Sequence, residues 1–244
     1  MRLIQLSDCH LFGDCSRTGY ASVNPYQSLK AVLDQTASLL PDLVLVTGDI
    51  SGDSSEQSYQ HFLTLIQPIL PNVEVKIIAG NHDSNPFFEK SLSEYSLVAS
   101  HPWVKDNWVM HGLDSRHEHT LGKVSDLQLD LLQAALNHHP SANHFIALHH
   151  HPLPADSWMD NHPLVDAEAF ISLVNANPQI KAVVHGHVHF PLQRQIGTTP
   201  VLGVPSTCWQ WEMTTDFAIS SERPGLRIFD LQDNGSWTTQ IRRV

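Results

Sequence analysis

The chain has 244 residues, of which 41% are hydrophobic, so it is long enough for one large α/β domain over residues 1–244 with a substantial core. The formal net charge of -11, from 14 basic and 25 acidic residues, argues against a nucleic-acid partner, because wrapping a phosphate backbone requires a basic face. The short amino-terminal apolar run and the absence of any 18-residue apolar stretch predict a soluble cytoplasmic protein without a membrane partner.

The first third of the chain alternates apolar runs of strand length with segments of helical periodicity. Asn24 and Pro25 are a typical cap and first-turn proline, and Ser54 or Ser55 can cap the following helix. The expected elements are a strand over residues 2–7, a helix ending near 41, a strand over 43–47, a helix with apolar residues from 59 to 69 and a strand over 73–79. This alternation predicts a largely parallel sheet.

The middle of the chain continues the same pattern less regularly. We expect one short helix and then a loop over residues 86–104. Ser125 and Gln128 have the form of a capping box for the next helix, and Asp166 is expected to cap another. Apolar runs predict strands over residues 108–113, 145–148 and 181–184.

The carboxyl-terminal quarter changes character. From residue 192 onward, strands joined by short turns are expected over 192–196, 201–204, 226–231 and 237–241. Asn234-Gly235 is a strong hairpin signal. The pattern therefore predicts antiparallel β structure at this end of the chain.

Five of the expected strands end in the same kind of polar residue. Because the carboxyl ends of parallel strands lie along one edge of a sheet, groups that are far apart in sequence converge there. Any single member could be a buried histidine bonded to a carbonyl, but unrelated core histidines would not all select this edge. The residues are Asp8 and His10, Asp49, Asn81 with His82, His149, and His187 with His189.

This set has the chemistry of a metal site. Carboxylate, amide and imidazole donors without sulfur suit iron (Fe), manganese (Mn), zinc or cobalt. Cys9, Cys15 and Cys208 lack zinc-type spacing and are expected to be reduced. Seven donors exceed what one ion takes from a protein while keeping an open position, so two divalent metal ions are implied, with Asp49 as the candidate bridge.

The ordered motifs resemble a known family. Asp8-x-His10, Gly48-Asp49, Gly80-Asn81-His82-Asp83, His149 and Gly186-His187-x-His189 are similar to the five blocks of the calcineurin-like metallophosphoesterase superfamily. Residues 8–12, 58–62, 148–154 and 205–208 further resemble the bacterial class III cyclic-nucleotide phosphodiesterases. The resemblance implies a metallophosphoesterase-type sandwich of two mixed β-sheets flanked by helices.

The resemblance also assigns the donors. It implies one ion held by Asp8, His10, Asp49 and His189, and a second held by Asp49, Asn81, His149 and His187. The choice of His149 over His150 or His151 follows the family pattern. Fe and Mn are the expected metals, with zinc or cobalt as alternatives. The substrate-binding residues implied are His10, Asp49, Asn81, His82 and His189.

The activity implied is hydrolysis of 3',5'-cyclic AMP to 5'-AMP. A hydroxide held between the ions would attack phosphorus, and His82 would act as the catalytic residue beside the leaving oxygen. The alternative for His82 is a purely structural role. Cys208 and Trp209 could face the nucleotide or the core, whereas Trp211 and Phe217 are interpreted as packing residues.

Two other functions are compatible with these motifs. The metal blocks indicate the bond that is cleaved and say little about the attached group, so a glycerophosphodiester, another cyclic nucleotide or a phosphomonoester is an alternative substrate. A non-catalytic scaffold of the same fold is a third hypothesis. Such a scaffold is expected to lose metal ligands or His82, and this chain keeps them. A monomer is the default expectation.

Overall fold

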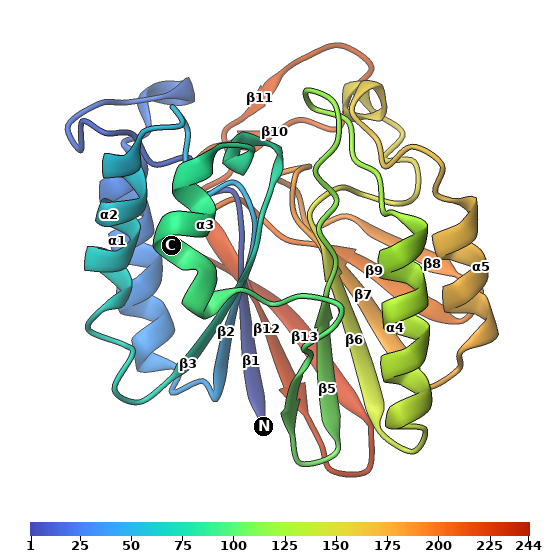
Figure 1. The fold of residues 1–244 in the computed structure, drawn as a ribbon. Helices are drawn as coiled ribbons and strands as arrows, with labels where there is room; N and C mark the ends of the chain where they lie inside the picture. Colours follow the sequence, from blue (N-terminus) through green and yellow to red (C-terminus); the bar gives the residue numbers. More distant parts are fainter.

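Two β-sheets form the centre of the structure, a computed structural model that describes all residues 1–244 (Figure 1). The first sheet has five strands. In spatial order they are β13 (Trp237–Arg243), β12 (Gly225–Leu231), β1 (Arg2–Leu6), β2 (Leu43–Thr47) and β3 (Glu74–Ile78). The three amino-terminal strands are mutually parallel, whereas β12 and β13 are antiparallel additions at one edge.

The second sheet has six strands, and it packs face to face with the first. In spatial order they are β4 (Trp103–Lys105), β5 (Trp108–Gly112), β6 (Asn143–Leu148), β7 (Ile180–His185), β9 (Thr199–Gly203) and β8 (Gln193–Ile196). A separate two-stranded ribbon is formed by β10 (Gln210–Trp211) and β11 (Ile219–Ser220).

Helices cover the outer face of each sheet (Figure 1). Those on the first sheet are α1 (Pro25–Ser38), α2 (Glu56–Ile66) and α3 (Pro86–Leu92), and those on the second are α4 (Asp126–His138) and α5 (Glu168–Ala176). Short 3-10 turns occupy Tyr20–Ser22, Asn81–Asp83, Ser93–Tyr95 and Trp158–Asn161. The structure thus confirms the predicted sandwich of two mixed sheets flanked by helices. No helix has both the length and the apolar character needed to cross a membrane.

Side chains on β2 show why this sequence forms a layered core. Val44 and Val46 face α1 and α2, while Leu43 and Leu45 face the second sheet. All four are fully buried, because a strand covered on both faces needs an uninterrupted apolar run. Burying one such side chain contributes about 1.5–3 kcal/mol. The core therefore holds the ends of the central strands in fixed positions.

Several local predictions were wrong. The region 86–104 contains α3 as expected, but its end forms the edge strand β4. The carboxyl-terminal quarter is not wholly antiparallel, because β9 pairs in parallel with β7. Ser125 does cap α4, yet the Gln128 side chain bonds the backbone of Asp114 rather than completing a capping box. Asp166 does not cap α5, since it forms an ion pair with Lys123 and Ala167 occupies the cap position.

A buried histidine pair lies between neighbouring strands of the second sheet. His111 on β5 and His144 on β6 are both fully buried, and their Nε2 and Nδ1 atoms are 2.8 Å apart. His144 Nε2 donates to the carbonyl of His139, so His144 Nδ1 is the acceptor and His111 the donor. Burial and then the charge of His144 lower the pKa of His111 to about 3. Both rings are therefore neutral in the folded protein.

This pair is expected to make the fold sensitive to acid. Unfolded histidine takes up a proton near pH 6.5 while folded His111 does so near 3, so the free energy of unfolding falls as pH drops through this window. The slope is up to about 1.4 kcal/mol per pH unit for one proton. In urea unfolding at pH 7, 6 and 5, the free energy of unfolding should fall less steeply with decreasing pH for His111→Phe than for the unsubstituted protein. Equal slopes would contradict this role.

Candidate active site

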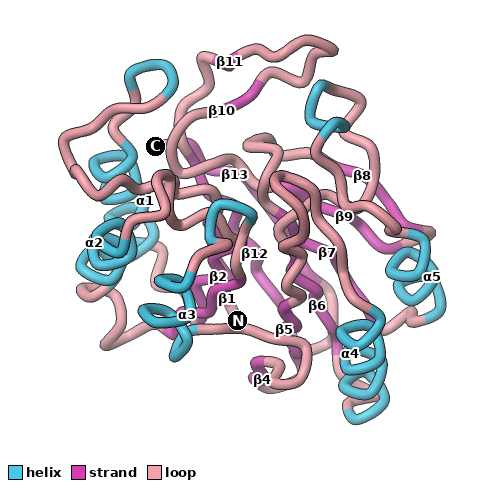
Figure 2. Tube along the Cα trace, turned by 45° about the horizontal axis from the view of Figure 1, so that its top comes forward, coloured by secondary structure: helices cyan, strands magenta, loops and turns pink.

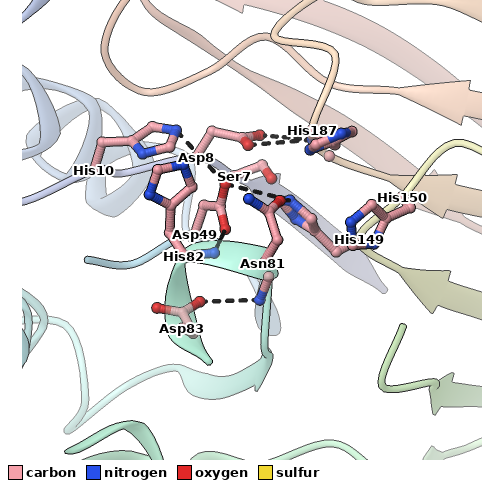
Figure 3. Close-up of polar contacts among 12 residues, drawn as sticks. Ser7, Asp8, His10, Asp49, Asn81, His82, Asp83, His149, His150 and His187 are labelled. Carbon is pink, nitrogen blue, oxygen red and sulfur yellow. Dashed lines mark hydrogen bonds and ion pairs between the residues drawn. The ribbon is translucent and has the colours of Figure 1, made fainter. Parts of the chain in front are cut away.

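Seven of the polar side chains predicted at strand ends, together with His82, converge at one edge of the sandwich (Figure 3). Asp8 and His10 follow β1, Asp49 follows β2, and Asn81 and His82 follow β3. The second sheet contributes His149 after β6 and His187 and His189 after β7. The prediction of convergence is confirmed, but the strand ends belong to two facing sheets rather than to one parallel sheet. The site therefore spans the junction between the sheets.

The backbone at this edge is unusual. Five of the converging residues have positive φ angles: Asp8 (56°), His10 (45°), Asp49 (55°), His187 (69°) and His189 (46°). Non-glycine residues rarely adopt this left-handed conformation, and each instance costs on the order of 1–3 kcal/mol. All five lie two or four residues after the end of a strand. The fold thus tolerates strain at the positions that orient the polar side chains.

Close backbone approach at two glycines makes room for the carboxylates. A Cβ atom at Gly80 would lie 2.2 Å from Asp49 Oδ1, and one at Gly186 would lie 2.0 Å from Ser7 Oγ and 2.9 Å from Asp8 Oδ2. Real contacts are never this short, so any larger residue would displace the acidic side chains. The glycines that precede Asn81 and His187 are therefore part of the site's construction.

The donor atoms form two adjoining groups. In the first group, His189 Nε2 lies 3.1 Å from His10 Nε2 and 3.3 Å from Asp8 Oδ1. In the second, His149 Nε2 lies 3.3 Å from Asp49 Oδ2 and 3.2 Å from Asn81 Oδ1, and the ring of His187 completes the group. Asp49 Oδ2 is also 3.7 Å from His10 Nε2. Asp49 therefore connects the two groups.

Backbone carbonyls fix the orientation of three of the imidazoles. Thr47 O is 2.7 Å from His149 Nδ1, Trp209 O is 2.8 Å from His189 Nδ1, and His162 O is 3.0 Å from His187 Nε2. A carbonyl only accepts, so each of these nitrogens carries a hydrogen and the other nitrogen of the ring faces the site. Metal-binding histidines almost always have such a partner.

The buried carboxylates at this edge form no ion pair with a lysine or an arginine. Asp8 and Asp49 are 0% and 2% exposed, and the ion-pair partners of both are histidines. Burial would raise the pKa of Asp49, but His149, His82 and His10 outweigh it and hold that pKa well below its usual value. Burial would lower the pKa of His149, but Asp49 and then Asp8 raise it to about 9.

These properties fit divalent cations. A proton on His149 supplies positive charge that a metal ion would replace, since metal binding displaces ligand protons. His10 is already neutral, because burial and then His82 lower its pKa to about 3. The donors are nitrogen and oxygen only, and Cys9 packs in the core between the first sheet and its helices. The two groups could hold a binuclear metal site.

His82 lies beside these groups and is exposed. Its ring meets the ring of His10 edge-on at 4.8 Å, and its backbone N–H donates to Asp49 Oδ1 at 2.9 Å. The neighbouring Asp83 is fully buried and accepts from the backbone N–H groups of Gly80, Ile50 and Ser51. Asp83 therefore holds the turn that carries His82.

A cavity of about 770 Å³ opens directly above the donor groups. Its lining includes six of the residues predicted at strand ends, namely His10, Asp49, Asn81, His82, His187 and His189, and also residues that no strand-end pattern identifies. Trp209 lines the cavity and also belongs to a buried apolar cluster, so its position is compatible with both of its predicted roles. Trp211 packs in a buried apolar cluster, as interpreted from the sequence, and it also lines the cavity together with Phe217. Sequence patterns did not identify three further lining residues, Tyr20, Trp158 and His162, whose only signal is a large side chain in an irregular segment.

Comparison with known proteins places the chain in a family. Residues 1–191 match the profile of the calcineurin-like phosphoesterases. The chain is 36% identical over its whole length to a 3',5'-cyclic adenosine monophosphate phosphodiesterase (CpdA) of Vibrio vulnificus, covering 90% of that protein. It is 34% identical to a 3',5'-cyclic-nucleotide phosphodiesterase of Nostoc sp., over 99% of this chain and 92% of that one.

Solved structures support the same fold at low identity. A dimetal phosphatase from Danio rerio superposes with a TM-score of 0.66 and 15% identity, over 100% of this chain and 96% of that one. Members of the matched family use divalent metals, and the two donor groups described above are consistent with that chemistry. By sequence and by fold, this chain belongs to the calcineurin-like phosphoesterase family.

Proposed function

We propose that this protein hydrolyses 3',5'-cyclic nucleotides, with cyclic AMP as the substrate and 5'-AMP as the product. The observation that carries the proposal is the pair of donor groups joined by Asp49 beneath an open cavity. The full-length similarity to the cyclic-nucleotide phosphodiesterases of Vibrio vulnificus and Nostoc favours this substrate over other phosphodiesters.

In this proposal Asp8, His10, Asp49 and His189 hold one divalent ion, and Asp49, Asn81, His149 and His187 hold the other. The distances among the donor atoms within each group support this division. Iron and manganese are the metals proposed, with zinc or cobalt as alternatives, because the donors lack sulfur. Bound there, the ions would supply positive charge for the phosphoryl oxygens and lower the pKa of the attacking water.

The protein's own side chains then have distinct tasks. The ring of His82 would hold or protonate the departing 3' oxygen, because it is exposed at the cavity. The substrate phosphate would be held by the metal ions, and these ions would be held in part by His10, Asp49, Asn81 and His189. The carbonyls of Thr47, Trp209 and His162 would keep the ligand rings from rotating.

A substrate panel tests this proposal. The metal-loaded protein is assayed against 3',5'-cyclic AMP, 3',5'-cyclic GMP, a 2',3'-cyclic nucleotide and glycerophosphocholine, with a chelated sample as the control. We expect kcat/KM to be highest for the 3',5'-cyclic nucleotides and 5'-AMP to be the product from cyclic AMP. A preference of about tenfold or more for another ester, which corresponds to ~1.4 kcal/mol in the barrier, would overturn the substrate assignment. Inactivity on every ester would instead support a non-catalytic scaffold.

A further inference from the structure

Six aromatic side chains other than histidine line the cavity next to the donor groups, and five of them, all except Phe12, form what we call the aromatic recess. They come from three loops that are distant in sequence but lie over the same edge of the sandwich (Figure 2). Tyr20 belongs to the loop after β1, and Trp158 to the loop between β6 and α5. The other three flank or belong to the ribbon of β10 and β11: Trp209, Trp211 and Phe217.

The floor of the aromatic recess rests on the donor groups themselves. Trp209 stacks on His10 with ring centroids 5.2 Å apart and an interplanar angle of 20°. Trp211 stacks on His189 at 4.7 Å and 19°. Both tryptophans are buried, at 6% and 8% exposure. The recess therefore begins at two of the proposed metal ligands and extends outward from them.

The rim of the aromatic recess is open to solvent. Tyr20 is 49% exposed, Phe217 is 51% exposed, and Trp158 is half-buried. The rim rings meet each other and the floor edge-on, with centroid separations of 5.0 Å for Trp158 and Phe217 and 5.2 Å for Tyr20 and Trp211. Contiguous exposed aromatic surface next to a polar centre is typical of a ligand site.

The loops that carry the rim are held in place. A Cβ atom at Gly19 would lie 2.1 Å from the ring of Trp209, so only glycine lets this loop rest on the floor. Ala21 and Ser22 then adopt positive φ angles of 51° and 57°, which fixes the turn that contains Tyr20. On the other side, the backbone N–H of Trp158 donates to Thr214 O at 2.8 Å, which joins two of the three loops. The recess is therefore preformed.

We propose that the aromatic recess binds the nucleobase of the substrate, with Tyr20 and Phe217 as the principal stacking partners. This inference rests on the proposed function, because a cyclic nucleotide whose phosphate is held at the donor groups must extend its base into the adjoining space. A flat purine gains from aromatic contact on its faces, whereas a glycerol or choline group has no such face. Tyr20 and Phe217 are thus specificity-determining residues.

Binding of two matched probes tests the inference without relying on turnover. AMP and ribose 5-phosphate carry the same phosphate and sugar, and only AMP carries a base. We expect the metal-loaded protein to bind AMP at least about fivefold more tightly than ribose 5-phosphate, since one stacked base contributes ~1–3 kcal/mol. Titration calorimetry measures both affinities, and quenching of tryptophan fluorescence by AMP alone reports contact with the recess.

The double variant Tyr20→Ala/Phe217→Ala should lower the affinity for AMP by about fivefold or more and leave that for ribose 5-phosphate within about twofold. Phe217→Tyr, which keeps the ring, should bind AMP normally. Leu40→Ala is the matched control, because Leu40 is 83% exposed and lies at the opposite edge of the sandwich, before β2. Thermal unfolding checks that each variant is folded.

The outcomes separate this inference from the proposed function. If the unsubstituted protein hydrolyses cyclic AMP and the double variant keeps the full preference for AMP over ribose 5-phosphate, the base binds elsewhere and the inference is wrong. If the unsubstituted protein hydrolyses no cyclic nucleotide, the proposed function fails first. A loss of affinity for both probes in the double variant would show damage to the phosphate site and would also overturn the assignment.

Discussion

Asp49→Asn is expected to remove most of the bound metal and to lower the rate of phosphodiester hydrolysis by about a thousandfold or more, because several kcal/mol of charge stabilisation would be lost. Asp49 is the residue whose carboxylate reaches both donor groups, at 3.3 Å from His149 Nε2 and 3.7 Å from His10 Nε2. Asparagine has the same shape but no charge, so two ions would lose their shared anionic ligand.

Metal content after desalting, measured by mass spectrometry, and kcat on cyclic AMP test this prediction. Asp53→Asn is a matched control, since Asp53 lies four residues further along and bonds Gly13 and Ser55 rather than either donor group. That variant should retain both ions. Retention of two metal equivalents by Asp49→Asn would show that the carboxylate does not bridge the groups, and the division of ligands would have to be redrawn.

His82→Ala is expected to keep both metal ions and to lose about 10²–10⁴-fold in kcat, the usual contribution of a positioned general acid. The substitution leaves the backbone N–H of residue 82 in place, so its 2.9 Å hydrogen bond to Asp49 Oδ1 is preserved. Only the exposed ring is removed. The loss should be smaller for a phosphodiester with a 4-nitrophenyl leaving group, because that oxygen needs little protonation.

The alternative role for His82 has a distinct result. His10, Asp49 and His82 also lie within the reach of a single ion, so His82 could act as a ligand. Loss of metal from His82→Ala would then be observed, with equal effects on both substrates. His138→Ala is the control, because His138 is exposed at the end of α4 and lies outside the cavity. That variant should behave like the unsubstituted protein.

The convergence of the polar side chains could be predicted because it depends on a regular feature of the chain. Apolar runs define where each strand ends, and residues such as Asp49 and His149 follow those runs within two positions. The left-handed backbone at Asp8 and His187 was not predictable from these patterns, since aspartate and histidine adopt other conformations far more often. The geometry within the site therefore required the structure.

The parts that escaped prediction depend on contacts between distant segments. Asp166 has the composition of a helix cap, but Lys123 competes for its carboxylate. Gln128 is drawn away from its own helix by the backbone of Asp114. The aromatic rim was missed for the same reason, because Tyr20 and Phe217 meet only when loops nearly 200 residues apart fold over one edge. The local hydrophobic periodicity of a sequence does not show which distant segments come into contact.

The position of the donor groups at the junction of the two sheets has a mechanical consequence. Asp8, His10 and Asp49 extend from one layer, and His149, His187 and His189 from the other, so a coordinated cation would cross-link the two halves of the sandwich. The free energy of unfolding would then rise with the concentration of free metal ion, by about 2.7 kcal/mol when that concentration is one hundred times the dissociation constant. A shortage of the metal ion around the protein would therefore lower the stability of the fold and stop hydrolysis at the same time.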